Sequence, residues 1–256
     1  EESYLLFPED RKYPIRMFED IPLKWAVSGP STSFEGTAQP GEYYVFQVGV
    51  WAARKAVPGL DVDLPALSTD GGKRISRSQV TCFNLCGRDW LGRPMRRDFA
   101  VAQGQVRALW FGIQIPQDAE GVYRGTFTIR PEGAPPCDVA VQIDVAGPVL
   151  ADGGVNDLWR MSRLKWLNSR LGLDEEVIPP YTPLEVNGDT IRCLQREVRF
   201  GQSGLPDSII SKGRNILAAP MRLVAESPGG TAPAEPPESW TVSKAPGVVR
   251  RVTRIA

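Results

Sequence analysis

Two adjacent carboxylates, Asp174 and Glu175, are the residues of this chain whose types and spacing most suggest hydrolytic chemistry. Glycoside hydrolysis uses a pair of carboxyl groups that flank the scissile bond, one of them as the proton donor. The pair and the following Glu176 precede a Val-Ile-Pro-Pro stretch that starts at Val177, so a solvated acidic turn explains the pair without chemistry. We favour the turn, and we expect no catalytic residue in the chain.

Aromatic residues beside charged ones form a second group of candidates, for contact with carbohydrate. Tyr and Trp rings combine an apolar body with a polar edge, which suits the mixed surface of a sugar. The competing interpretation, favoured for Trp159, Trp166 and Tyr181, is packing between two domains, because each ring buries a large apolar area. The full set of candidates is Trp90, Trp159, Arg163, Trp166, Asp174, Glu175, Tyr181 and Trp240.

A charged cluster surrounds Trp90. Its members are Arg88, Asp89, Arg93, Arg96 and Arg97. With the ring, they have the composition of a contact site for sugar or for an acidic polymer. The alternative, which we favour, is a long loop whose arginine stems cover the ring and keep their charges in water.

Histidine is absent from the chain. Its absence excludes Ser-His-Asp and Cys-His nucleophile systems and removes the commonest zinc ligand. The four cysteines are Cys82, Cys86, Cys137 and Cys193, and only the first two lie close together, which fits no zinc pattern. We therefore expect no metal site and no cofactor. Disulfides and buried free thiols both remain open.

The composition is that of a folded globular protein, with 42% hydrophobic and 23% charged residues. The formal net charge of zero argues against nucleic acid as a partner, because phosphate binding needs an excess of basic residues. No apolar run is long enough to span a bilayer. Residues 1–14 lack the basic start and apolar core of a signal peptide, which leaves a mature form, an internal fragment or an intracellular protein open.

Alternation of apolar and polar residues predicts that residues 13–147 are all β. It is clearest from Cys137 to Val145, where every second residue is Val or Ile, and similar stretches cover 42–50, 106–116 and 122–131. Pro-Gly and Asp-Gly-Gly turn signals separate these stretches, and no interval shows a helical period long enough for a crossover helix. An immunoglobulin-like β-sandwich fits this pattern best.

We expect two domains joined by a linker: an immunoglobulin-like sandwich over 1–148, a linker over 149–158 and a second, incomplete β-sandwich over 159–256. The Gly153-Gly154 pair interrupts the periodicity. Beyond it, Asn187-Gly188 is a hairpin signal, and residues 227–237 (SPGGTAPAEPP) predict a mobile loop. The β-like run at 248–255 is either an edge strand or part of a larger domain.

Several long segments together resemble bacterial proteins related to glycoside hydrolase family 123. They are 40–47 (PGEYYVFQ), 84–94 (NLCGRDWLGRP), 147–153 (GPVLADG), 160–169 (RMSRLKWLNS), 174–183 (DEEVIPPYTP) and 204–209 (GLPDSI). The resemblance implies N-terminal β-sandwiches followed by a catalytic (β/α)8 barrel. The catalytic Asp-Glu pair of that family lies in the barrel, so its role is not carried over to Asp174 and Glu175.

The resemblance implies a non-catalytic N-terminal region of a secreted, periplasmic or cell-surface glycoside hydrolase that acts on a polysaccharide or glycan. Its partners would be carbohydrate and the downstream barrel of the same polypeptide, with no nucleic acid and no membrane insertion. Two alternatives stay open. One is a self-contained carbohydrate-binding module, with Trp90, Trp159, Trp166 and Trp240 as its aromatic contacts. The other is a structural or adhesion β-sandwich protein.

Overall fold

The computed structural model describes residues 3–224 and 238–254, and the chain forms two compact units, Glu1–Ser169 and Arg170–Ala256. Both are built from β-sheets, which confirms the all-β prediction. The boundary expected at 149–158 differs from the one that the contacts show, because residues 149–169 belong to the first unit. No helix in the described part of the chain has the length and apolar character that crossing a membrane requires.

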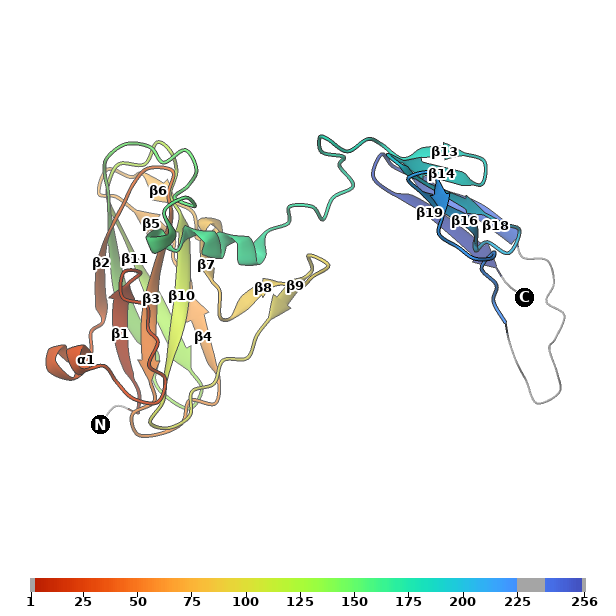
Figure 1. Ribbon diagram of the computed structural model, residues 1–256. Helices are drawn as coiled ribbons and strands as arrows, with labels where there is room; N and C mark the ends of the chain where they lie inside the picture. Colours follow the sequence, from red (N-terminus) through yellow and green to blue (C-terminus); the bar gives the residue numbers. More distant parts are fainter. Residues whose placement is uncertain (1–2, 225–237, 255–256) are drawn as a thin grey trace, which may run out of the picture. The chain divides into compact units, whose positions relative to one another are not determined.

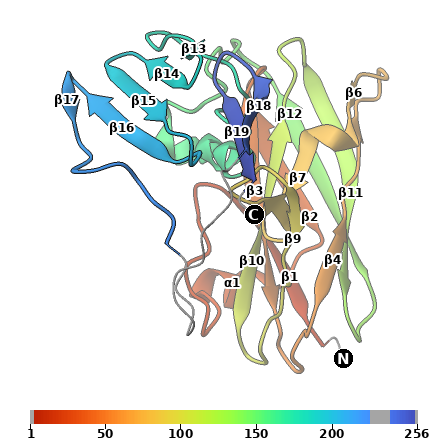
Figure 2. The same cartoon turned by 90° about the vertical axis from the view of Figure 1, so that its right-hand side faces the viewer.

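Two sheets pack face to face in the first unit (Figures 1 and 2). The first has the order β1-β3-β10-β7, and its strands are β1 (Leu5–Asp10), β3 (Tyr43–Trp51), β7 (Val80–Cys82) and β10 (Val106–Gln114). The second has the order β2-β12-β11-β5-β6, with β4 also paired to β11. Its strands are β2 (Ser33–Ala38), β4 (Leu60–Asp63), β5 (Leu67–Ser68), β6 (Arg74–Ile75), β11 (Gly121–Pro131) and β12 (Cys137–Val145).

The core between these sheets is aromatic. Phe46 of β3, Phe111 of β10 and Phe127 of β11 are fully buried, with ring centroids 5.1–5.4 Å apart. Strand β12 shows the predicted alternation, with Val139, Val141, Ile143 and Val145 buried. Burying a side chain of this size contributes about 1.5–3 kcal/mol. The first unit therefore has a continuous core that can hold surface segments in place.

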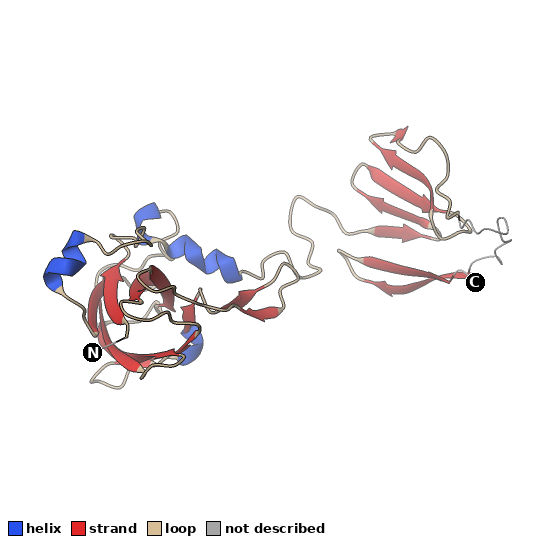
Figure 3. Ribbon diagram, turned by 90° about the horizontal axis from the view of Figure 1, so that it is seen from below, coloured by secondary structure: helices blue, strands red, loops and turns tan. Residues whose placement is uncertain are grey.

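Short helices lie outside the sandwich, as Figure 3 shows, and none was predicted as a defined helix. The helix α1 (Leu23–Ser28) buries Trp25, whose ring stacks on Phe7 of β1 with centroids 4.3 Å apart. The others are 3-10 turns: η1 (Arg77–Gln79), η2 (Leu158–Arg160) and η3 (Ser162–Asn168). Trp25 of α1, with Met161 and with Leu164 of η3, covers the outer face of β3, which is why that strand is buried on both faces rather than on one.

The second unit contains a five-stranded sheet and a two-stranded ribbon. The sheet runs β13 (Glu185–Asn187), β14 (Thr190–Cys193), β15 (Arg196–Phe200), β16 (Pro206–Ser211) and β17 (Arg214–Asn215), and the ribbon pairs β18 (Glu238–Lys244) with β19 (Val249–Arg254). The β13–β14 turn at Gly188 confirms the predicted hairpin. Arg251 of the ribbon forms an ion pair with Asp189 in the β13–β14 turn. The predicted loop at 227–237 lies outside the described residues.

Candidate functional site

Residues 149–169 are tied to the first sheet by buried hydrogen bonds. The Tyr43 N–H donates to the carbonyl of Gly153 at 3.0 Å, and the buried hydroxyl of Ser162 donates to the carbonyl of Tyr43 at 2.8 Å. Gly153 and Gly154 are buried, with φ angles of 68° and 85° that other residues rarely adopt. The glycine pair therefore makes a tight turn against the sandwich, where the sequence pattern had indicated a linker.

A buried carboxylate anchors this segment more firmly. Glu42 is fully buried and forms ion pairs with Arg11, which is only 3% exposed, and with Arg160 at 3.0 Å. It also accepts the backbone N–H of Gln39 at 2.9 Å. Arg160 pairs in addition with Asp157 at 2.7 Å. Buried charges are tolerated only when they are paired and hydrogen-bonded, so this network fixes η2 on the sandwich.

Trp159 lies beside the network and is 48% exposed. Three cations approach its ring: the guanidinium groups of Arg160 and Arg11, at 4.6 and 5.0 Å from the centroid, and the Lys12 ammonium at 5.6 Å. A cation over an indole face is attracted by the ring quadrupole. These three cationic side chains therefore pack around the Trp159 ring and orient it.

A shallow apolar groove follows along η3. It measures about 460 Å³ and is lined by Leu158, Met161, Arg163, Leu164, Trp166 and Leu167. Trp166 is 53% exposed, and the Arg163 guanidinium lies 5.5 Å from its ring centroid. The Arg163 Nε–H donates to the carbonyl of Val155 at 2.8 Å, which orients the side chain. The structure thus brings Arg163 and Trp166 together, whereas the Trp159 ring lies against Arg11, Lys12 and Arg160 and does not line the groove.

Trp90 occupies the turn of a separate hairpin, β8 (Cys86–Arg88) and β9 (Pro94–Arg96). Asp89 shapes the turn by accepting the N–H groups of Leu91 and Arg93, both at 2.9 Å, and by pairing with the Arg93 Nε at 2.7 Å. The Arg93 backbone hydrogen bond, with help from its side chain, lowers the pKa of Asp89. The carboxylate therefore stays charged and keeps the turn closed.

The Trp90 ring is 83% exposed, so the expectation that arginine stems cover it is wrong. The arginines are engaged elsewhere: Arg88 donates to the carbonyl of Gly92 at 2.8 Å, and Arg96 pairs with Asp61 at 2.9 Å. Those partners draw the side chains away from the indole.

The hairpin and η3 lie side by side in Figures 1 and 3. A side-chain carbon added at Gly87 of β8 would lie 3.1 Å from the Asn168 carboxamide oxygen and 3.8 Å from the Arg97 guanidinium. Two segments distant in sequence thus form one surface. We call the exposed side chains of residues 86–97 and 158–169 the basic aromatic face.

The remaining predicted residues lie in the second unit, in the segment before β13 and on β18. Asp174 and Glu175 are exposed, and the Asp174 carboxylate accepts the N–H of Glu176 at 3.1 Å, as in a solvated turn. Glu175 lies 4.0 Å from Arg250. Tyr181 is exposed. Trp240 lies on β18 opposite Val252, and its side chain falls outside what the structure describes.

All four cysteines are free thiols. Cys82 is buried, and burial raises the pKa of its thiol to about 12. Cys86 is exposed, and its thiol donates to the carbonyl of Cys82 at 3.2 Å. No group of three or more potential ligands that could hold a metal ion occurs among the described residues.

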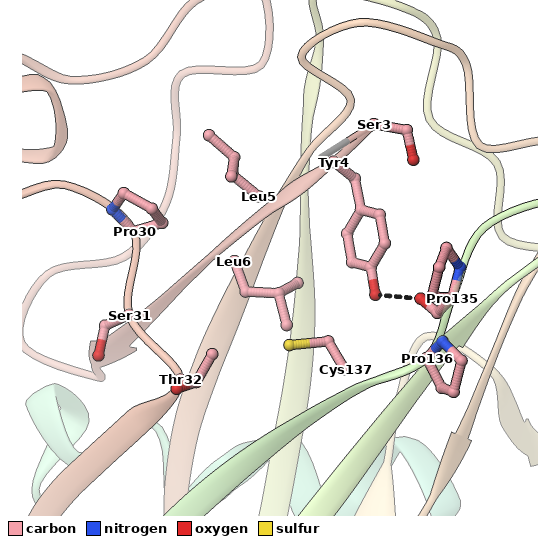
Figure 4. A pocket seen from close by; sticks show the side chains of 10 residues that line it. All are labelled: Ser3, Tyr4, Leu5, Leu6, Pro30, Ser31, Thr32, Pro135, Pro136 and Cys137. Atoms are coloured by element: carbon pink, nitrogen blue, oxygen red, sulfur yellow. Dashed lines mark hydrogen bonds between the residues drawn. The ribbon is translucent and has the colours of Figure 1, made fainter. Parts of the chain in front are cut away.

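A pocket of about 480 Å³ opens at the seam between the edge strands β1 and β2 (Figure 4). Its wall includes Leu6, Thr32 and the Cys137 thiol, and the Tyr4 hydroxyl donates to the carbonyl of Pro135 at 2.8 Å. None of the described residues that line it is charged. Sequence reasoning missed this pocket, because its residues come from three distant segments without a shared motif.

Arg11, Glu42 and Arg160 were also missed. The only sequence signal for them is Glu42, a charged residue directly before the strongly apolar strand β3.

Residues 184–255 match the family model described as "Glycoside hydrolase 123, third domain". This match lies within the second unit, and it relates the chain to glycoside hydrolase family 123, as the resemblance implied. A search of curated proteins finds no match.

Three solved structures match the chain at low identity and low TM-score. A family 123 glycoside hydrolase from Clostridium perfringens, described for glycolipid glycan hydrolysis, has a TM-score of 0.45 and 13% identity over 57% of this chain and 28% of its own. This chain thus spans 28% of that enzyme. The PapD-like domain 7 of human CEP192 has a TM-score of 0.30 and 11% identity, over 47% of this chain and 83% of its own. The periplasmic chaperone SfaE has a TM-score of 0.26 and 11% identity, over 86% of this chain and 94% of its own.

Proposed function

We propose that this chain is a non-catalytic accessory region of a bacterial, secreted or cell-surface glycoside hydrolase. In this proposal, its β-units support a catalytic barrel elsewhere in the same polypeptide, which acts on a glycan. The observation that carries the proposal is the match of residues 184–255 to the third domain of family 123. An accessory role also fits the exposed turn that holds Asp174 and Glu175, since catalytic carboxylates work in a shaped and partly desolvated site.

The test compares two proteins on a panel of chromogenic glycosides and natural glycans. One is this chain alone, and the other is the longest polypeptide that its native gene encodes. We expect turnover only by the longer protein. Hydrolysis by this chain alone, lost on Asp174→Asn without loss of the folded state, would overturn the accessory role and assign catalysis to the turn.

The second candidate function is a carbohydrate-binding module. It is favoured by one observation, the exposure of the Trp90, Trp159 and Trp166 rings on one unit. Binding modules place exposed aromatic rings against sugars, and an accessory region of a glycan hydrolase can also bind glycan.

A further inference from the structure

The basic aromatic face holds the three tryptophans that are exposed among the described side chains, together with an excess of basic residues. Residues 86–97 and 158–169 carry seven arginine and lysine residues and one acidic residue, in a chain with 30 of each kind. They also contain three of the seven tryptophans. A solvated surface of an electrically neutral chain has no structural need for this concentration.

Part of the positive charge is used internally. Carboxylates of Asp89, Asp61 and Glu42 pair with Arg93, Arg96 and Arg160. The described ion pairs include none with Arg88, Arg97 or Arg163, whereas the Lys165 ammonium interacts with the Asp152 carboxylate. The guanidinium groups of Arg88, Arg97 and Arg163 are therefore available to an anionic ligand.

The positions of the rings are fixed. Trp159 is held by the buried Glu42 network that anchors η2, and Trp166 belongs to η3, which Ser162 ties to β3. Arg163 is oriented by its bond to the Val155 carbonyl and lies next to Trp166. A planar guanidinium beside an exposed indole, along a groove of about 460 Å³, matches a sugar ring that carries an anionic group. The ring would stack on the indole while the guanidinium binds the anion.

We propose that the basic aromatic face binds an acidic oligosaccharide, with Trp166 and Arg163 at its centre and Trp90 and Arg97 at its hairpin side. The ligand class is a saccharide with carboxylate or sulfate groups. Its identification as a saccharide, and not another polyanion, rests on the proposed function. The binding itself rests on the charge and the exposed rings.

The test is direct binding by the full chain, measured by isothermal titration calorimetry in low-salt buffer. The probes are polygalacturonate, chondroitin sulfate, carboxyl-reduced polygalacturonate and a single-stranded oligodeoxynucleotide. The first and second probes separate carboxylate from sulfate, and the reduced polymer keeps the sugar rings but removes the charge. We expect one acidic polysaccharide to bind, the reduced polymer to lose at least tenfold in affinity, and added NaCl to weaken binding.

The variants locate the site. Trp166→Ala and Arg163→Gln should each weaken binding about tenfold or more, since a charge-assisted hydrogen bond or a stacked ring contributes that much. Arg97→Gln provides a second charge variant away from the groove. Arg124→Gln is the matched control, because Arg124 is a half-exposed arginine of β11 in the other sheet. It should change affinity less than twofold, and circular dichroism confirms that each variant is folded.

Four results would overturn the proposal: no binding of either acidic polysaccharide, equal binding of the reduced polymer, equal binding of the oligodeoxynucleotide, or binding that Trp166→Ala and Arg163→Gln both leave intact. None of these results bears on whether the longer polypeptide hydrolyses glycans. The hydrolysis comparison decides the accessory role independently.

Discussion

Removing the buried carboxylate of Glu42 is predicted to destabilise the first unit strongly. Glu42→Gln keeps the size of the side chain but leaves Arg11, only 3% exposed, without its counter-ion. Breaking a buried ion pair in this way costs about 3–5 kcal/mol. Arg160 keeps its pairing with Asp157, so we expect a value near the lower end, about 3 kcal/mol. At about 2–4 °C per kcal/mol, the melting temperature should fall by about 6–12 °C.

The assay is urea unfolding followed by tryptophan fluorescence. Six of the seven tryptophans lie in the first unit, so the signal reports mainly on that unit. The matched control is Asp63→Asn, which removes the half-exposed ion pair with Arg130 and should cost at most about 1 kcal/mol. If Glu42→Gln cost no more than Asp63→Asn, the account of a buried network that anchors η2 would be refuted.

Two further predictions concern packing and the thiols. Gly36→Ala should destabilise by about 1–3 kcal/mol in the same urea assay, because the added carbon would lie 2.0 Å from the hydroxyl of the buried Tyr44; an unchanged midpoint would contradict the close approach. Cys86 should react with Ellman's reagent at pH 8 well before Cys82, whose pKa burial raises from 9.0 to about 12. Because the folded state holds that proton more tightly, the stabilisation from Cys82 is fully present below pH 9 and is lost as the pH rises towards 12. Equal reaction rates of the two thiols would contradict its burial.

Strand positions were predictable where one face of a strand meets the core. In β12 the residues that are apolar in the alternating sequence pattern are the ones that are buried in the structure. The same reasoning described β3 as half-buried, whereas Tyr43 and Val45 on its outer face are covered by Met161 and Leu164. These two residues are more than a hundred positions away in the sequence, so the alternation of apolar and polar residues within the strand does not reveal that they cover it. The sequence pattern therefore identifies the face of a strand that meets the opposite sheet, but not the segments that cover its outer face.

The candidate site was predictable in composition but not in assembly. Trp159, Arg163 and Trp166 belong to one short segment, and the proximity of Arg163 and Trp166 follows from their spacing. Their link to the Trp90 hairpin, and the Glu42 network that fixes them, depend on tertiary contacts between distant residues. The exposure of the Trp90 ring could not be predicted from the sequence either. Whether the nearby arginines cover the ring depends on their hydrogen-bond and ion-pair partners, which the sequence does not show.

The most direct test of the accessory role uses the longest polypeptide that the native gene encodes. Asp174→Asn combined with Glu175→Gln should leave its glycan hydrolysis at the level of the unsubstituted protein, since both carboxylates are exposed on a turn. Loss of hydrolysis by the substituted protein, with an unchanged melting temperature, would contradict the account and place the chemistry in this chain.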